Sequence, residues 1–293
     1  MIALNLDILI GFFLDFTIQF GVIISILFLA TKSKMFVTQF SSNKGSYQGN
    51  RAIAISSIGY YLSIILIIYS AVQGESFGYM YDIISIFSTV LIGLIFLSIN
   101  RWIINIFYLK DLNPKYELEK ENIAFAIFQA SGFLATATIF YKSFAGFEFS
   151  LGLIYVGTIY FFITQLSLFV MIKIFILKTS YDDVREIKKG NVAVAIEFLS
   201  IFVAISMLFG NIAEAVIDID LNSIATLFIY FLISSIFLIY LPSLLTSILI
   251  VGNKKVDNSI ADGNMIIAVK SAVVKITIAI VIIETLPLNI VVT

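Results

Sequence analysis

Eight apolar segments run through this sequence, and each is long enough to cross a lipid bilayer. The hydrocarbon core of a bilayer is about 30 Å thick, so a transmembrane helix needs roughly 20 predominantly apolar residues. The segments lie at about 8–30, 50–73, 82–109, 122–145, 149–178, 191–213, 222–251 and 264–288. The sequence therefore predicts an all-α integral membrane protein with eight transmembrane helices, and no loop is long enough to hold a soluble domain.

The composition agrees with that class and removes several kinds of chemistry. Hydrophobic residues make up 60% of the 293 residues and charged residues 13%, whereas soluble domains average about 45–50% and about 25%. Cysteine and histidine are absent, which excludes disulfides, thiolate nucleophiles, imidazole catalysis and the commonest metal ligands. We therefore expect no metal ion and no cofactor. The first residues lack the basic start and cleavage site of a signal peptide, so we expect a first span there.

A repeated unit of about 70 residues is visible at the starts of the even-numbered segments. Each of these segments begins at an asparagine, and the intervals between the asparagines are 72, 69 and 73 residues. The openings read GNRAIAISSIG at Asn50, ENIAFAIFQASG at Asn122, GNVAVAIEFLS at Asn191 and GNMIIAVKSAV at Asn264. The unit is a helical hairpin used four times. Because each copy contains two spans, the copies enter the membrane in one direction, which predicts quasi-symmetry about the membrane normal around a central seam.

The four asparagines have two interpretations. Asparagine is a preferred N-cap residue, whose side chain accepts a hydrogen bond from the first turn of its helix. The alternative is that four helix N-termini converge as an anion site. Beyond the caps, small residues recur along one helix face and predict close packing. In the second segment they are Ala52, Ser56, Gly59 and Ser63. In the last segment they are rotated to Ala268, Ala272 and Ala279, interrupted by Lys275.

Five ionisable residues lie well inside the predicted spans: Asp15, Arg101, Glu197, Lys270 and Lys275. A charge at membrane depth is a functional hypothesis that needs a partner. Glu197 and Lys270 stand sixth after their asparagines, so we expect Glu197 to face protein and to pair with Lys270 or Arg101. A second pair is expected between Asp15 and Lys275. Such pairs could hold the repeats in register or line a transport path, and Lys270 and Arg101 could instead extend to the interface.

Lysine and arginine are distributed unevenly between the two sides of the membrane. The connections that lead into the asparagine helices hold Lys32, Lys34, Lys44, Arg51, Lys110, Lys115, Lys120, Lys178, Arg185, Lys188, Lys189, Lys254 and Lys255. The opposite side holds Lys142 against eight acidic residues. Basic residues in short loops favour the cytoplasmic side. We therefore expect a multi-pass protein of the inner membrane with both termini outside the cytoplasm.

The pattern of hairpin, short charged turn and GNxAxAI helix opening resembles the family called domain of unknown function 350. The residues that carry the resemblance are Asn50, Ala52, Ala54, Asn122, Ala124, Ala126, Gly190, Asn191, Ala193, Ala195, Gly263, Asn264 and Ala268. The last copy departs from the pattern, with Ile266 in place of the first alanine. The resemblance implies small prokaryotic inner-membrane proteins, commonly with four spans. It would make this chain a tandem pair, with domains at 1–146 and 147–293, and it implies no established activity.

Three classes of function compete. The first is a non-catalytic membrane scaffold, whose basic turns recruit a soluble protein or anionic lipid. The alternative is a channel or transporter for a small solute or ion, with the intramembrane charges on its path. The third, an intramembrane enzyme, is disfavoured because the sequence has no Ser–His or Cys–His set, no HExxH and no GxGD motif. We expect a scaffold embedded in the lipid bilayer with no nucleic-acid partner, and homo-oligomerisation stays open.

Overall fold

The computed structural model describes residues 6–38, 49–73, 78–108, 112–144, 151–214, 221–248 and 256–285, and every element within them is a helix. The helices are α1 (Leu6–Thr38), α3 (Arg51–Val72), α4 (Tyr79–Phe107), α5 (Pro114–Glu119), α6 (Ile123–Phe144), α7 (Leu151–Lys178), α8 (Asp183–Lys188), α9 (Val192–Glu214), α10 (Leu221–Thr246), α11 (Val256–Ala261) and α12 (Met265–Thr285).

Seven of these helices are long and apolar enough to cross a membrane: α3, α4, α6, α7, α9, α10 and α12. The prediction of an all-α, multi-pass membrane protein is therefore confirmed. The predicted eighth span corresponds to α1, a continuous helix of 33 residues. Its described apolar stretch, Phe16–Lys32, is shorter than a full span, so the count of eight stays a prediction.

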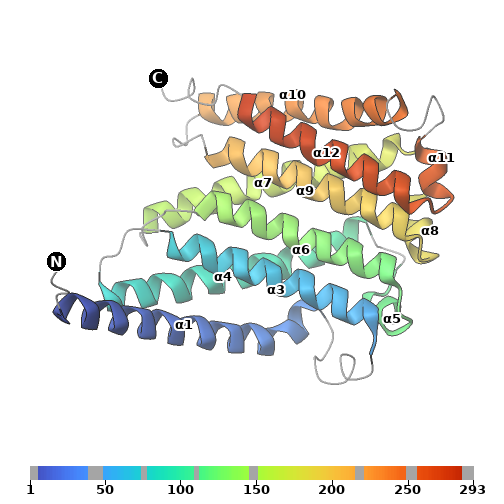
Figure 1. Ribbon diagram of the computed structural model, residues 1–293. Helices are drawn as coiled ribbons and strands as arrows, with labels where there is room; N and C mark the ends of the chain where they lie inside the picture. Colours follow the sequence, from blue (N-terminus) through green and yellow to red (C-terminus); the bar gives the residue numbers. More distant parts are fainter. Residues whose placement is uncertain are drawn as a thin grey trace, which may run out of the picture.

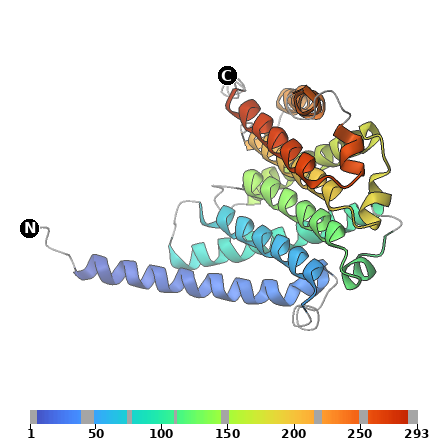
Figure 2. The same cartoon turned by 45° about the vertical axis from the view of Figure 1, so that its right-hand side comes forward.

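The long helices form two layers, as Figures 1 and 2 show. The inner layer is a row in which α3 packs on α6, α6 on α9 and α9 on α12. Each helix of the outer layer covers a seam of that row. Helix α4 contacts α3 and α6, α7 contacts α6 and α9, and α10 contacts α9 and α12. Helix α1 lies at the end of the stack, against α3 and α4.

The inner row is open, which differs from the predicted arrangement around a central seam. Small residues let adjacent helices approach closely: a Cβ added at Gly59 of α3 would lie 2.4 Å from the Cβ of Ala130 on α6. In α6 and α9, 78% and 72% of the apolar span is buried, against 28% in α12. The two middle helices therefore pack on both sides, so the repeats extend in a line. The predicted quasi-symmetry about the membrane normal is not confirmed.

Three short helices, α5, α8 and α11, each precede an inner helix, and all three lie at the same end of the helix bundle (Figure 1). We call this end the basic face. Each short helix ends in the same way, with two backbone hydrogen bonds of the Schellman type. In α5 the N–H of Glu121 donates to Leu118 and the N–H of Asn122 donates to Glu117. The equivalent bonds close α8 and α11. The asparagine is thus both the last residue of this motif and the N-cap of the spanning helix.

The asparagine side chains also join each repeat to the next. The Oδ1 atoms of Asn50 and Asn122 accept from the backbone N–H three residues on, at 2.9 and 3.0 Å. Their Nδ2 atoms donate to carbonyls of the following repeat, Asn50 to Leu118 and Asn122 to Ile187, both at 2.8 Å. Asn191 repeats the link, with Nδ2 donating to Ala261 at 2.9 Å. One amide therefore satisfies a helix start and the end of a neighbouring short helix.

The fourth asparagine, Asn264, caps its own helix by accepting from the N–H of Ile267 at 3.2 Å. The four caps lie along the open row and not around a common centre. The alternative interpretation, in which the four helix starts converge on one anion, therefore does not fit this arrangement.

Candidate functional site

A buried ion pair joins the last two repeats inside the membrane. Lys275 of α12 donates to Oε2 of Glu197 on α9, and the two side chains are 7% and 3% exposed. The ammonium also donates to Ser271 Oγ at 2.9 Å and lies 5.7 Å from the ring centroid of Phe175 on α7. Burying two charges costs several kcal/mol per ion unless their geometry and further hydrogen bonds compensate. The hydroxyl and the aromatic ring supply part of that compensation.

The prediction that Glu197 faces protein is confirmed, but the predicted partner is wrong. Glu197 pairs with Lys275, and neither Lys270 nor Arg101 takes that place. Lys270 is exposed on the lipid side of α12, and Arg101 is half-buried on α4, in another part of the row. The predicted partner of Lys275, Asp15, lies in α1, and its side chain is outside the described residues.

The rotation of α12 explains this error. An equal distance from the capping asparagine predicts an equal depth in the bundle, but it does not determine the direction in which a side chain faces. The buried residues of α12 are Ala268, Ser271, Lys275, Ile278 and Ala279. Three of them, Ala268, Lys275 and Ala279, belong to the rotated small-residue stripe, whose remaining member Ala272 is half-buried. This face brings Lys275 against α9. Sequence reasoning identified that stripe but did not use it to choose the partner of Glu197.

A small polar cavity adjoins the pair on the side of the basic face. Its volume is about 30 Å³, and its lining includes Glu197, Lys275, Lys178, Thr179, Ser243 and Asp257. A space of this size holds about one water molecule where polar partners are available. Oε1 of Glu197 is buried and has no hydrogen-bond partner among the described residues. The cavity therefore places polar groups between this carboxylate and the end of α7.

Lys178 closes the outer side of this cavity. Its ammonium donates to Ser243 Oγ at 2.9 Å and to the carbonyl of Ile239, both on α10, and it lies 4.7 Å from the ring centroid of Tyr240. A carbonyl oxygen has two lone pairs, so Ile239 can accept from Lys178 as well as from its own helix. Sequence analysis counted Lys178 only as a basic residue at the end of a span.

An acidic group lies just beyond Lys178, at the start of α8. Asp183 is buried, and its Oδ2 accepts from Thr179 Oγ1 at 2.6 Å. Burial raises the pKa of Asp183 to about 7, and the nearby Asp182 and Asp257 add to the effect. Burial and the same acidic neighbours raise the pKa of Tyr181 as well. Sequence reasoning missed this group, because no pattern indicates that one of two adjacent aspartates is buried.

Comparison with known proteins identifies a family. A family model described as Domain of Unknown Function (DUF350) matches the chain twice, over residues 6–144 and 149–286. The two matches are consistent with a tandem duplication of the domain, so the resemblance seen in the sequence is confirmed. No curated protein and no solved structure matches the chain.

Proposed function

The chain belongs to the DUF350 family as two tandem copies of its domain, and we propose that it is a non-catalytic scaffold of the inner membrane. In this proposal α1 is an eighth span, both termini lie outside the cytoplasm, and the basic face is cytoplasmic. The basic face recruits anionic lipid headgroups or an acidic soluble partner.

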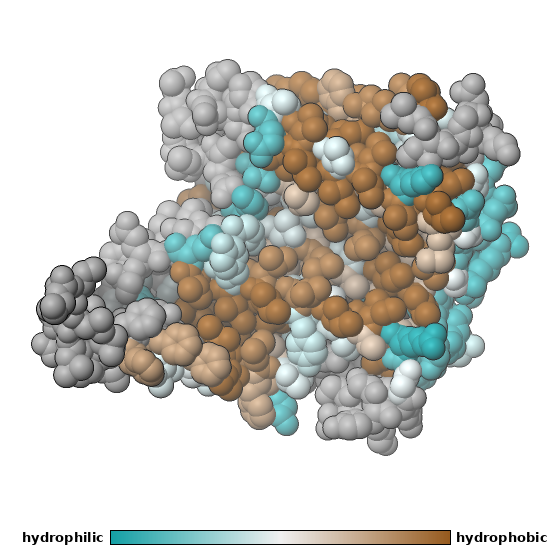
Figure 3. All heavy atoms as spheres, viewed as in Figure 1, coloured by the Kyte–Doolittle hydropathy of each residue, from teal (hydrophilic) through white to brown (hydrophobic). Residues whose placement is uncertain are grey.

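The repeated construction of the basic face carries this proposal. Three short helices are held in register by the same asparagine link, so they form a rigid series and not three independent loops. Exposed basic side chains stand on two of them, at Lys115, Lys120, Arg185, Lys188 and Lys189. Figure 3 shows hydrophilic residues gathered at this end, beside a broad hydrophobic belt.

The charges on this face are mixed, which bears on the kind of partner. Lys120 lies 2.9 Å from Glu117, and Lys189 pairs with Glu186. Glu117 is buried, so its pair with Lys120 belongs to the fold, whereas Lys189 is exposed. An ion pair at the surface contributes at most about 1 kcal/mol, so Lys189 can exchange Glu186 for a lipid phosphate or for a carboxylate of a partner, worth about 1 kcal/mol near an anionic surface.

A second candidate function, ion or proton translocation, is favoured by the Glu197–Lys275 pair. The pair lies beside a polar cavity, and one carboxylate oxygen of Glu197 has no hydrogen-bond partner among the described residues. A charge that lines a path sets the electrostatic barrier for a permeating ion. The close packing of the inner row supports the scaffold, because it leaves only small spaces beside the pair.

One experiment compares the two functions. Purified protein in liposomes is assayed for retained anionic lipid and for proton or cation flux. For a scaffold, we expect K188E/K189E to lose most of the retained anionic lipid while K188R/K189R keeps it, and Glu197→Gln to leave flux at the level of empty liposomes. Reproducible flux through the wild-type protein that changes in Glu197→Gln would favour translocation. If lipid retention is equal in all variants, the recruiting role fails for lipid and has to be sought in a protein partner.

A further inference from the structure

A second cavity, larger than the one beside the ion pair, lies in the outer layer between α4 and α7. Its volume is about 230 Å³, and apolar atoms form almost all of its lining. Four phenylalanines surround it: Phe96, Phe161, Phe162 and Phe169. Leu166 and Phe162 at its edge are 60% and 44% exposed, so the cavity is open toward the lipid. It separates an outer helix of the first family match from one of the second.

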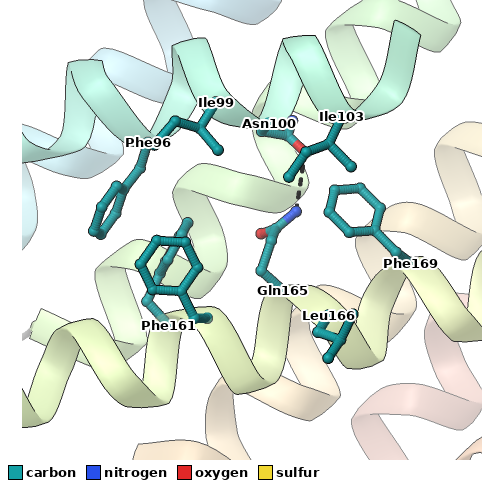
Figure 4. A pocket seen from close by; sticks show the side chains of 9 residues that line it. Phe96, Ile99, Asn100, Ile103, Phe161, Gln165, Leu166 and Phe169 are labelled. Carbon is teal, nitrogen blue, oxygen red and sulfur yellow. Dashed lines mark hydrogen bonds between the residues drawn. The ribbon is translucent and has the colours of Figure 1, made fainter. Parts of the chain in front are cut away.

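Two amides form the polar part of this cavity, as Figure 4 shows. Gln165 on α7 donates from Nε2 to Oδ1 of Asn100 on α4 at 3.0 Å. Asn100 in turn donates from Nδ2 to the backbone carbonyl of Gly132 on α6 at 3.2 Å. A backbone carbonyl can only accept, so it determines the direction of the whole chain of hydrogen bonds. The amide of Gln165 therefore has to direct its nitrogen to Asn100 and its oxygen away from it.

Oε1 of Gln165 is consequently an acceptor without a donor among the described residues. The residue is 3% exposed, and it stands near the middle of the apolar span Ile154–Lys178, where bulk water does not reach. In Figure 4 the oxygen points toward the side of the cavity that holds Phe161. An unpaired acceptor in apolar surroundings costs free energy, so a ligand that brings a donor here gains a hydrogen bond without breaking one.

We propose that this cavity binds a lipid-soluble molecule with a flat aromatic ring and a hydroxyl group, which donates to Gln165 Oε1. The phenylalanine rings favour an aromatic body, because aromatic pairs gain energy beyond burial when stacked or edge-on. The size also fits, since an apolar cavity of about 150 Å³ holds benzene and this one has room for two fused rings. A plain hydrocarbon chain of a bilayer lipid would fill the space but leave Oε1 unpaired.

A matched pair of probes tests the proposal. The ligands are 2-naphthol, which has a hydroxyl donor, and 2-methoxynaphthalene, which has the same rings and no donor. Binding to the full chain in nanodiscs is measured by ligand-observed NMR, with empty nanodiscs subtracted to remove partitioning into lipid. A buried hydrogen bond of typical strength corresponds to about tenfold in affinity, so we expect 2-naphthol to bind about tenfold more tightly.

Three variants locate the binding. Gln165→Leu should abolish the preference for 2-naphthol, and Ile99→Trp, which fills the cavity, should remove binding of both probes. Ile95→Trp is the matched control, because this residue is one turn earlier on α4, 57% exposed and outside the cavity lining. If Ile99→Trp does not fold, Leu166→Trp at the exposed edge of the cavity takes its place.

A preference for 2-naphthol that disappears in Gln165→Leu and survives Ile95→Trp supports the site. Equal affinities of both probes for the wild type would mean that the cavity takes hydrocarbon only. Equal affinities would overturn the proposal. So would a preference for 2-naphthol that persists in Gln165→Leu, or the absence of saturable binding.

Discussion

At the scale of single residues, the Glu197–Lys275 pair illustrates how a membrane protein tolerates charge. Neither group could remain charged alone in hydrocarbon at low cost. Together they sit between α9 and α12, with Ser271 and Phe175 as further partners of the ammonium. The helices that meet there belong to neighbouring repeats, so the pair also favours this contact over other packings of α12.

We expect a double-mutant cycle to detect this pair directly. Glu197→Gln or Lys275→Met alone leaves one buried charge without its partner, which costs about 3–5 kcal/mol. The double variant leaves no charge and should lie close to the wild type. The free energy of unfolding of the three variants is measured in detergent by denaturant titration. Lys270→Met is the control, since Lys270 is exposed on the same helix and should change stability little. Additive effects of the two single changes would contradict the coupling.

Asp183 predicts a pH dependence with a defined sign. Its pKa in the fold is raised to about 7 by burial, above the usual value near 4. The folded state therefore binds the proton more tightly than the unfolded state, so this group stabilises the fold least at high pH. Its contribution is constant below about pH 4, falls by about 1.4 kcal/mol per pH unit up to about pH 7, and is then constant again.

Asp183→Asn tests this dependence. Asparagine retains an oxygen that can accept from Thr179 and does not titrate. We expect the variant to gain stability relative to the wild type as pH rises from 5 to 8, measured as the difference between their thermal midpoints. A difference that stays constant over this range would show that Asp183 is not the titrating group. The absolute stability of both proteins also depends on other groups, so only the difference is informative.

At the scale of elements, the repeated unit is a short helix, a Schellman turn and an asparagine-capped span. The turn needs a residue with positive φ, and glycine adopts this conformation without steric cost. Gly190 and Gly263 have φ of +86° and +82° in two copies, and Gly49 has +73° before Asn50. The copy that begins at Asn122 has Glu121 instead, with φ of +61°.

Glu121→Gly should therefore stabilise the protein. A non-glycine residue in the left-handed region costs about 1–2 kcal/mol, part of which is offset by the greater freedom of glycine in the unfolded chain. We expect a net gain of up to about 1 kcal/mol in unfolding free energy. Gly190→Ala provides the converse change in the equivalent turn and should lose stability. A loss in Glu121→Gly would indicate that the exposed glutamate side chain contributes more than the backbone strain costs.

At the scale of the whole molecule, the repeats stack in a line because the two middle inner helices have small or apolar residues on both sides. This explains why the inner layer is compact while α4, α7 and α10 expose much of their surface to lipid. It also creates the cavity between α4 and α7, where two outer helices are held apart by the inner helix beneath them.

The proposed orientation can be tested because the chain contains no cysteine. Single cysteines at the exposed positions Ser180 and Gln73 lie at opposite ends of the bundle. We expect a membrane-impermeant maleimide to label Gln73→Cys in intact cells and Ser180→Cys only after permeabilisation, because the basic side of short loops is usually cytoplasmic. The reverse pattern would place the basic face outside and refute the proposed cytoplasmic recruitment.

The sequence alone was sufficient for the features that depend on local spacing. Apolar length predicts the spans, the four-fold asparagine opening predicts the caps and the repeat, and the same residues indicate the family. Helix periodicity also marked the small-residue faces, including the rotated stripe of α12. These features are local because a cap or an apolar face is defined within a few turns of one helix.

Only the tertiary structure decided which faces meet. It assigned Glu197 to Lys275, arranged the four inner helices in an open row, and brought Asn100 and Gln165 together across two domains. Residues that are 65 or 78 positions apart meet according to the rotation and tilt of whole helices. Those are set by the packing of many side chains at once, because in a membrane the lipid is as apolar as the helix surface and does not itself select a face.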